Sequence, residues 1–249
     1  LKPKGKTPET VAADGNRDVK RLTDVTDPVL EVFPAPANNN KGIGVIICPG
    51  GGYSILAINL EGYEIASWLN KLGYTAFVLQ YRVPKKEAGA LQDAQRAIRI
   101  VRSRAAEWGL RPEKIGMMGF SAGGSLTARA STEYNANTYT AIDKADALSA
   151  RPDFGILVYP AYLDKGDNRT LTPELKVNGE TPPMFLFATA DDTYSNSALV
   201  MAGALRDAKV PVELHLYPKG GHGYGLRSGN PAGEVWPSLL EKWLKTTVK

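Results

Sequence analysis

Strand-like and helix-like segments alternate along this chain from about residue 43 to its end, and this alternation restricts the fold more than any other feature. The run from Ile43 to Cys48 is continuously apolar, as expected of a strand that is buried on both faces of a sheet. Right-handed crossovers between parallel strands place helices on both faces of such a sheet. We therefore expect an α/β fold with a mostly parallel central sheet, and functional loops at the carboxyl ends of its strands.

Hydrophobic patterns and glycine stops give the expected elements. Strands are expected at Val29–Phe33, Ile43–Cys48, Thr75–Tyr81, Ile115–Gly119, Phe154–Tyr159, Met184–Ala190 and Val212–Tyr217. Helices are expected at Leu60–Leu72, Leu91–Trp108, after Ser121, Asn196–Ala208 and Glu234–Thr247.

The length of 249 residues suits one domain of the α/β type. Residues 1–24 are polar and contain prolines and glycines, so we expect an irregular N-terminal arm there. Residues 25–249 are expected to form a single catalytic domain. The chain has no insertion long enough for a large cap domain.

Composition argues against several classes of function. The formal net charge is only +4, and the densest basic stretch (Arg96, Arg99, Arg102 and Arg104) lacks the interleaved aromatic residues of a nucleic-acid platform. We interpret these arginines as a solvated helix face, and we expect no nucleic-acid partner. No apolar run reaches transmembrane length, so no membrane partner is expected either. One cysteine and two histidines predict no metal site and no cofactor.

The segment Gly119-Phe120-Ser121-Ala122-Gly123 matches the pattern G-x-S-x-G between an expected strand and an expected helix. In such a turn the serine has strained backbone angles, and side chains two residues away on either side would clash. The turn exposes the hydroxyl at a helix N-terminus, where developing negative charge is favoured. A small-residue turn for close packing is the alternative, but the strand–turn–helix context favours Ser121 as a nucleophile.

A serine hydroxyl needs a base, and the chain offers two histidines. His215 lies inside an expected strand, where a packed, hydrogen-bonded role is typical. His222 lies in the glycine-rich segment just after the last expected strand, where functional loops gather. We therefore predict that His222 is the general base.

An orienting carboxylate is expected between the serine and the histidine in chain order. The pair Asp191-Asp192 follows the expected strand Met184–Ala190, and one of the two should orient the histidine. The other is then a solvated carboxylate or a turn cap. Asp153 and Asp164, like Asp167, are weaker candidates because they lie near an earlier strand.

Pro49-Gly50-Gly51-Gly52-Tyr53 follows the strand that ends at Cys48. Consecutive glycines let backbone N–H groups approach a ligand without interference from side chains. We predict an oxyanion hole made by the N–H groups of Gly51 and Gly52 together with that of Ala122. A flexible turn or a phosphate-binding loop is the alternative for three glycines alone.

Beyond these residues, several short segments resemble the acetyl-xylan-esterase-related family of α/β-hydrolases, from about residue 25 to the C-terminus. They are Gly50-Gly51-Gly52-Tyr53, Glu61-Gly62, Ala66-Ser67-Trp68-Leu69-Asn70, Leu79-Gln80-Tyr81-Arg82, Ala90-Leu91-Gln92-Asp93-Ala94, Arg151-Pro152-Asp153-Phe154 and Tyr159-Pro160-Ala161-Tyr162. The resemblance implies an α/β-hydrolase fold and a triad of Ser121, Asp192 and His222. It also implies short acyl groups, such as acetate, on a carbohydrate alcohol, and it favours an extracytoplasmic location because hemicellulose-acting esterases are often exported.

Three tyrosines, Tyr53, Tyr162 and Tyr224, lie in loops that should face the site, where they could stack on a sugar. Two other functions compete with the esterase. A prolyl-oligopeptidase-like peptidase could use the same triad, although such exopeptidases usually owe their specificity to an extra domain. A non-catalytic binding protein could share the fold, although such proteins usually lose a triad residue.

Overall fold

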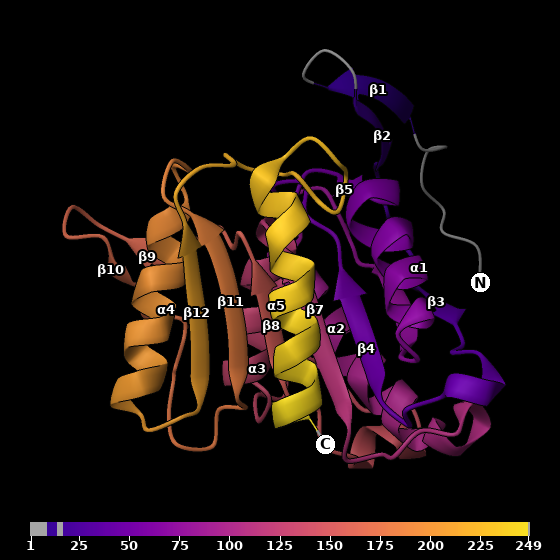
Figure 1. Ribbon diagram of the computed structural model, residues 1–249. Helices are drawn as coiled ribbons and strands as arrows, with labels where there is room; N and C mark the ends of the chain where they lie inside the picture. The colour runs from indigo at the N-terminus through magenta and orange to yellow at the C-terminus, as the bar shows by residue number, and fades with distance from the viewer. Residues whose placement is uncertain (1–8, 14–16, 249) are drawn as a thin grey trace.

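A seven-stranded sheet forms the centre of the computed structural model, which describes residues 9–13 and 17–248 (Figure 1). Its strands lie in the order β12-β11-β8-β7-β4-β6-β3. Every neighbouring pair is parallel except β3 and β6. This confirms the mostly parallel sheet expected from the sequence. The strands are β3 (Val29–Phe33), β4 (Gly44–Cys48), β6 (Thr75–Gln80), β7 (Ile115–Phe120), β8 (Gly155–Val158), β11 (Met184–Thr189) and β12 (Val212–Tyr217).

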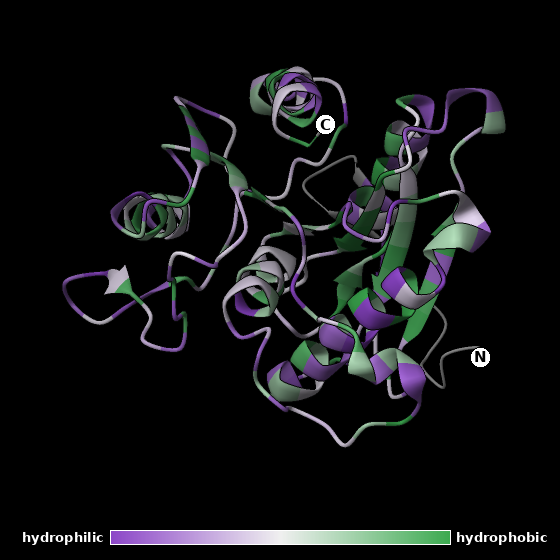
Figure 2. Ribbon diagram, turned by 90° about the horizontal axis from the view of Figure 1, so that it is seen from below, coloured by the Kyte–Doolittle hydropathy of each residue, from purple (hydrophilic) through white to green (hydrophobic). Residues whose placement is uncertain are grey.

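Helices cover both faces of this sheet. Helices α1 and α5 lie on one face, and α2, α3 and α4 lie on the other (Figures 1 and 2). Figure 2 shows that the strands are largely hydrophobic, whereas the helices carry hydrophilic residues on one side. None of the described helices combines the length and apolarity needed to cross a bilayer. The helices are α1 (Glu64–Lys71), which follows a π-helical turn at Asn59–Tyr63, α2 (Glu87–Ser103), α3 (Ala122–Thr132), α4 (Ser195–Asp207) and α5 (Pro231–Thr247).

Alternate residues of the central strands enter different parts of the core. Phe185 of β11 packs against Trp243 of α5, with a ring-centroid distance of 5.9 Å. Leu186, the next residue, belongs to a second cluster that contains Met201 of α4. Since both faces of the strand are covered, the sequence is apolar without alternation.

An antiparallel hairpin precedes the main sheet. It consists of β1 (Glu9–Ala13) and β2 (Arg17–Leu22), and β2 pairs in turn with the short strand β5 (Leu56–Ala57). The N–H of Ile58 also donates to the carbonyl of Lys20 at 3.0 Å. The hairpin therefore lies beside the loop that follows β4.

The prediction of an irregular arm over residues 1–24 is wrong for both strands of this hairpin. Residues 23–24 have no regular structure, as expected, and residues 1–8 and 14–16 of the predicted arm lie outside the described residues. Backbone pairing with β5 stabilises β2, and no side-chain pattern in the polar sequence signals such pairing.

A second small sheet, of β9 (Asp164–Lys165) and β10 (Thr170–Leu171), follows β8. Short 3-10 turns lie at Ala37–Asn39, Ala105–Trp108 and Lys144–Ala147.

The basic stretch of α2 is not a solvated face. Arg96 forms ion pairs with Asp143 at 2.6 Å and with Asp146 at 2.9 Å. Arg102 pairs with Asp153 at 2.7 Å, and its side chain is only 11% exposed. Arg96 and Arg102 therefore hold the segment between α3 and β8 against α2, which corrects our interpretation of them, whereas Arg104 is exposed and pairs with Glu107 three residues on.

We predict that Gly116→Ala destabilises the fold, because a Cβ at Gly116 would lie 2.1 Å from the buried ring of Phe154. Overpacking of this kind costs about 1–3 kcal/mol. Urea unfolding would measure the loss. Gly203→Ala in α4 is the matched control, since nothing lies within 4 Å of its Cβ and alanine gains roughly 0.5–1 kcal/mol in a helix. Equal stability of the two variants would contradict the packing of Phe154 on β7.

Candidate active site

Ser121 lies in the tight turn between β7 and α3, with a backbone φ of 50° and ψ of −118°. This conformation is strained for a residue with a side chain. A Cβ on Gly119 would lie 2.0 Å from the carbonyl oxygen of Gly123, and one on Gly123 would lie 2.0 Å from that of Cys48. The turn thus has the steric requirement that the glycine spacing predicted.

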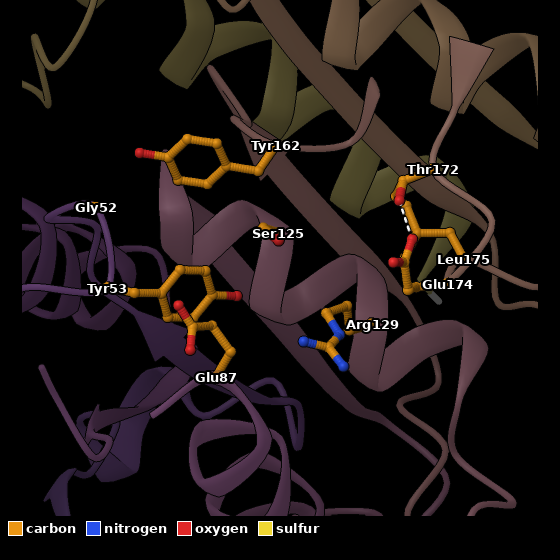
Figure 3. Close-up of a pocket in the computed structure, with 9 residues that line it drawn as sticks. All are labelled: Gly52, Tyr53, Glu87, Ser125, Arg129, Tyr162, Thr172, Glu174 and Leu175. Atoms are coloured by element: carbon orange, nitrogen blue, oxygen red, sulfur yellow. Dashed lines mark hydrogen bonds between the residues drawn. The ribbon is translucent and has the colours of Figure 1, made fainter. Parts of the chain in front are cut away.

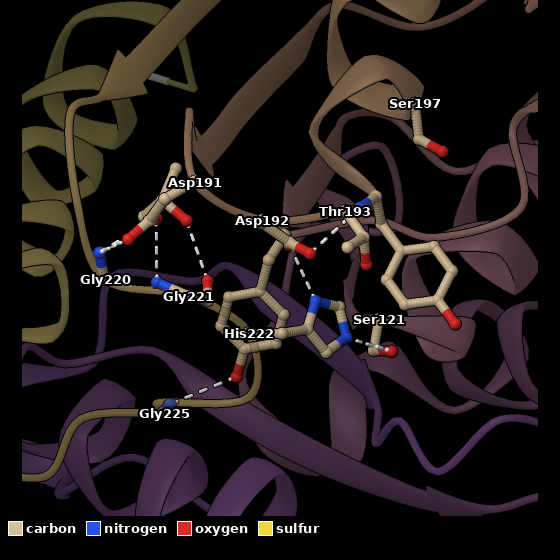
Figure 4. A network of polar contacts seen from close by, with 12 residues as sticks. Ser121, Asp191, Asp192, Thr193, Ser197, Gly220, Gly221, His222 and Gly225 are labelled. Atoms are coloured by element: carbon tan, nitrogen blue, oxygen red, sulfur yellow. Dashed lines mark hydrogen bonds and ion pairs between the residues drawn. The ribbon is translucent and has the colours of Figure 1, made fainter.

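His222 follows β12 and joins Ser121 to Asp192 in one chain of contacts (Figure 4). Its Nε2 lies 2.7 Å from Ser121 Oγ, and its Nδ1 lies 2.7 Å from Asp192 Oδ2. The Asp192 side chain is 1% exposed and also accepts the N–H of Tyr194 at 2.9 Å. A carboxylate at Nδ1 selects the tautomer in which Nε2 accepts a proton from the serine hydroxyl.

Asp191 has a different position from that of its neighbour. Its carboxylate accepts the N–H of Gly221 at 2.9 Å and that of Gly220 at 3.1 Å. These hydrogen bonds, led by that of Gly221, hold the pKa of Asp191 below its ordinary value. Asp191 therefore fixes the loop that carries His222, while Asp192 is the carboxylate that contacts the imidazole.

The glycine loop after β4 faces the serine from the other side. Gly51 has a φ of +136° and Gly52 a φ of +63°, and a Cβ on Gly51 would lie 2.1 Å from the carbonyl oxygen of Ile55. The N–H groups of Gly51, Gly52 and Ala122 donate no hydrogen bond to any described residue. These three N–H groups are the ones that we expected to bind an oxyanion, whereas the N–H of Gly50 already donates to a side chain.

The N–H of Gly50 donates to a buried carboxylate, that of Glu61, which we did not predict from the sequence. Glu61 is 3% exposed, and its Oε2 accepts that N–H at 2.7 Å. Its Oε1 accepts the hydroxyl of Tyr159 at 2.9 Å, which in turn accepts the N–H of Gly225 at 3.1 Å. Burial first, and then the Glu61 charge, raise the pKa of Tyr159 well above its ordinary value, so the phenol stays protonated.

A cavity of about 400 Å³ opens above these groups. Ser121 and His222 line it together with Arg21, which comes from β2 of the N-terminal hairpin. Tyr194 also lines it, and its ring lies 5.0 Å from the imidazole of His222 between centroids. Sequence reasoning missed Arg21 and Tyr194. Position in the loop after Asp192 was the only signal for the latter.

The three tyrosines that we expected to face the site have different positions. Tyr162 is 44% exposed and lines the cavity of Ser121. Tyr53 is buried and lines a neighbouring cavity. Tyr224 is only 1% exposed, and its ring packs on Tyr159 with a centroid distance of 4.4 Å. The prediction that Tyr224 contacts substrate is therefore wrong, because its side chain points into the core behind the imidazole.

The second histidine is part of the sheet. His215 Nε2 lies 2.8 Å from Glu213 Oε1, and its ring packs beside Phe185. Within residues 9–13 and 17–248, no three histidine, cysteine, aspartate or glutamate side chains gather in a way that could hold a metal ion.

Comparison with known proteins places this chain among hydrolases. A family model described as BD-FAE matches residues 30–158. The chain is 30% identical over 234 residues to an acetylxylan esterase of Xylanibacter ruminicola, which covers 84% of this chain and 46% of the relative. It is also 30% identical over 205 residues to endo-1,4-beta-xylanase B of Butyrivibrio fibrisolvens, which covers 72% of this chain and 32% of the relative. The chain thus spans less than half the length of these two relatives.

Solved structures are similar over nearly the whole chain. One is an acetyl ester-xyloside bifunctional hydrolase from Caldicellulosiruptor lactoaceticus, with a TM-score of 0.77 and 32% identity over 98% of this chain and 97% of that one. Another is MGS-M1, an α/β hydrolase enzyme from a Medee basin deep-sea metagenome library, with a TM-score of 0.69 and 29% identity over 98% of both chains.

We predict that the thiol of Cys48, the last residue of β4, does not react in the folded protein. Burial raises its pKa to about 12, so the thiolate is scarce at about pH 8, and the side chain is fully buried. Dithiodipyridine should detect no thiol in the native protein and one per chain after denaturation in guanidinium. Rapid reaction of the native protein would show that the end of β4 opens to solvent.

Proposed function

Since the chain belongs to the BD-FAE family of acetylxylan-esterase-related α/β-hydrolases, we propose that it is a serine carboxylesterase acting on short-acyl esters of a carbohydrate. The observation that carries this proposal is the hydrogen-bonded chain from Ser121 through His222 to Asp192. Ester hydrolysis by an acyl-enzyme needs a nucleophile, a base and an orienting acid, and these side chains supply all three.

In the first half of the reaction, Ser121 Oγ attacks the acyl carbonyl carbon while His222 Nε2 accepts the hydroxyl proton. Asp192 stabilises the imidazolium that forms, because its carboxylate already accepts the Nδ1 hydrogen. The carbonyl oxygen becomes an oxyanion, and the N–H groups of Gly51, Gly52 and Ala122 bind it. Each such donor contributes about 3 kcal/mol to the stability of the transition state.

The tetrahedral intermediate collapses when the ester C–O bond breaks. His222 returns the proton to the departing alcohol oxygen, and the acyl group stays on Ser121 as an ester. In the second half, water attacks the acyl carbon while His222 accepts its proton, the bond between that carbon and Ser121 Oγ breaks, and His222 returns the proton to Oγ as the carboxylic acid leaves. The serine hydroxyl is then restored.

Acetate on xylan is the substrate that we propose. Two of the matched proteins support it, since one is an acetylxylan esterase and the other hydrolyses acetyl esters and xylosides. A third relative is an endo-xylanase, which is consistent with a xylan-degrading context. The cavity beside Ser121 is lined by polar groups, among them Arg21, Tyr162 and Tyr194, and by apolar side chains such as those of Ile55 and Leu60, so it offers contacts both to a polar alcohol and to a short acyl group.

Two functions compete with this proposal. A peptidase would use the same three residues and would cleave an aminoacyl-proline p-nitroanilide. A non-catalytic binding protein would have no reason to retain a contact of 2.7 Å on each side of the imidazole, so the geometry weighs against it. Labelling of Ser121 by a fluorophosphonate probe would exclude the non-catalytic binding protein, and turnover of the p-nitroanilide would support the peptidase.

We predict that the wild-type protein hydrolyses p-nitrophenyl acetate faster than the butyrate, and the butyrate faster than the octanoate. Ser121→Ala should lower the initial rate on acetate by at least about 10⁴-fold, because it removes the nucleophile. Circular dichroism would verify that the variant is folded. Equal slow rates for both proteins on all three esters would overturn the esterase proposal.

The two adjacent aspartates make a matched pair of variants. Asp192→Asn should lower kcat on p-nitrophenyl acetate by about 10⁴-fold, because an amide favours the wrong tautomer of His222. Asp191→Asn should lower kcat by less than about tenfold, since its amide oxygen can still accept one N–H from the loop. Steady-state kinetics on both variants provides the measurement. A larger loss of kcat in Asp191→Asn than in Asp192→Asn would show that Asp191, and not Asp192, orients the histidine.

A further inference from the structure

We propose that a second cavity, next to that of Ser121, binds a neutral sugar residue of the carbohydrate whose ester is cleaved. This inference rests on the proposed esterase function and adds a subsite to it. The cavity has a volume of about 340 Å³ and shares Gly52 and Tyr162 with the cavity of Ser121. A substrate that extends over more than one sugar can therefore occupy both.

The cavity lies beside α3 (Figure 3). Ser125 and Arg129 come from that helix, one turn apart. Tyr53 and Glu87 lie on one side of it, and the loop that contains Glu174 lies on the other. Such a groove is open at the surface, as a polymeric substrate requires.

An aromatic row connects this cavity to the catalytic histidine. The rings of Tyr53 and Tyr162 are stacked, with centroids 6.5 Å apart and an angle of 29° between their planes. Tyr162 contacts Tyr194 at 5.4 Å, and Tyr194 contacts His222 at 5.0 Å. Aromatic faces give apolar contact area to the C–H face of a sugar, and their hydroxyls give polar contacts.

The hydroxyl of Tyr53 has unused hydrogen-bonding capacity that a ligand could satisfy. This side chain is 6% exposed, and its buried oxygen interacts with the side chain of Ser125 but makes no hydrogen bond of normal geometry to a described group. A buried hydroxyl without a partner is costly, and a bound hydroxyl would satisfy it. An acetyl methyl group has no polar atom to offer, so the alcohol part of the ester is the better occupant.

Charge selects a neutral sugar over a uronic acid. Arg129 is paired with Glu133 at 3.1 Å, and Glu174 is paired with Lys165 at 3.6 Å. Glu87 has no ion-pair partner among the described residues, so the cavity carries a net negative charge. A carboxylate on the ligand would be repelled, whereas sugar hydroxyls can donate to the glutamates and accept from Arg129 and Ser125.

The test compares three substrates on the whole chain: p-nitrophenyl acetate, an acetylated methyl xyloside and an acetylated xylo-oligosaccharide. Wild-type kcat/KM should be at least about tenfold higher on the oligosaccharide than on the monosaccharide. Tyr53→Phe should lower the ratio of kcat/KM on the oligosaccharide to that on p-nitrophenyl acetate by about five- to tenfold. Ser125→Ala, a mild change in a helix, is a second variant with the same expected direction.

Tyr74→Phe is the matched control, because Tyr74 precedes β6 at the opposite end of the parallel strands and lines a different cavity. It should leave the ratio unchanged. The thermal unfolding temperature of Tyr53→Phe should change little, since the removed hydroxyl makes no hydrogen bond of normal geometry within the described residues. A lower ratio with unchanged stability therefore reports binding and not damage to the fold.

The negative charge of the cavity predicts a preference between neutral and acidic substrates. Wild type should prefer a neutral acetylated oligosaccharide over one that carries a glucuronic acid, and Glu87→Gln should reduce that preference. Equal kcat/KM on the monosaccharide and the oligosaccharide, with Tyr53→Phe leaving the ratio unchanged, would overturn the subsite while p-nitrophenyl acetate hydrolysis continues. Absence of Ser121-dependent hydrolysis of p-nitrophenyl acetate would instead overturn the esterase proposal beneath it.

Discussion

The close approach of the Ser121 turn to the carboxyl end of β4 is the contact on which the rest of the site depends. Gly123 permits it, since a Cβ there would lie 2.0 Å from the carbonyl oxygen of Cys48 and 2.7 Å from that of Pro49. With no side chain between them, the first turn of α3 and the glycine loop lie against each other. N–H groups from both segments can then reach one oxyanion, which neither segment could bind as well alone.

The sequence predicts the main sheet well, because its five inner strands are buried on both faces and read as apolar runs, and its two edge strands are rich in branched and aromatic residues. The strands at Val29–Phe33 and Val212–Tyr217 have the predicted bounds, and each of the others differs by one residue at one end or at both. The hairpin of β1 and β2 could not be predicted, since it is held by backbone pairing with β5. Similarly, the ion pairs of Arg96 and Arg102 depend on acidic residues far along the chain, which helical periodicity alone does not reveal.

The positions of the serine, histidine and aspartate could be predicted from the strand order, whereas those of the residues packed around them could not. Ser121, His222 and the pair with Asp192 each come after a parallel strand, so they meet at one edge of the sheet. Glu61 lies in a helical segment, where a glutamate reads as solvent-exposed, yet it is buried under the glycine loop. The prediction that Tyr224 faces the site failed because a position in a loop does not specify the direction of a side chain, and this one is buried.

Glu61 and the N-terminal hairpin bring opposite charges to the cavity of Ser121. The Glu61 carboxylate links the Gly50 loop to Tyr159 and so to the loop after His222, which makes the site rigid before substrate arrives. A buried negative charge this close to the glycine loop would also oppose an oxyanion. Arg21 of β2 lines the same cavity and brings a positive charge to it. The hairpin therefore contributes a positive charge as well as a wall to the cavity, and a negative charge on a bound oxygen would benefit from it.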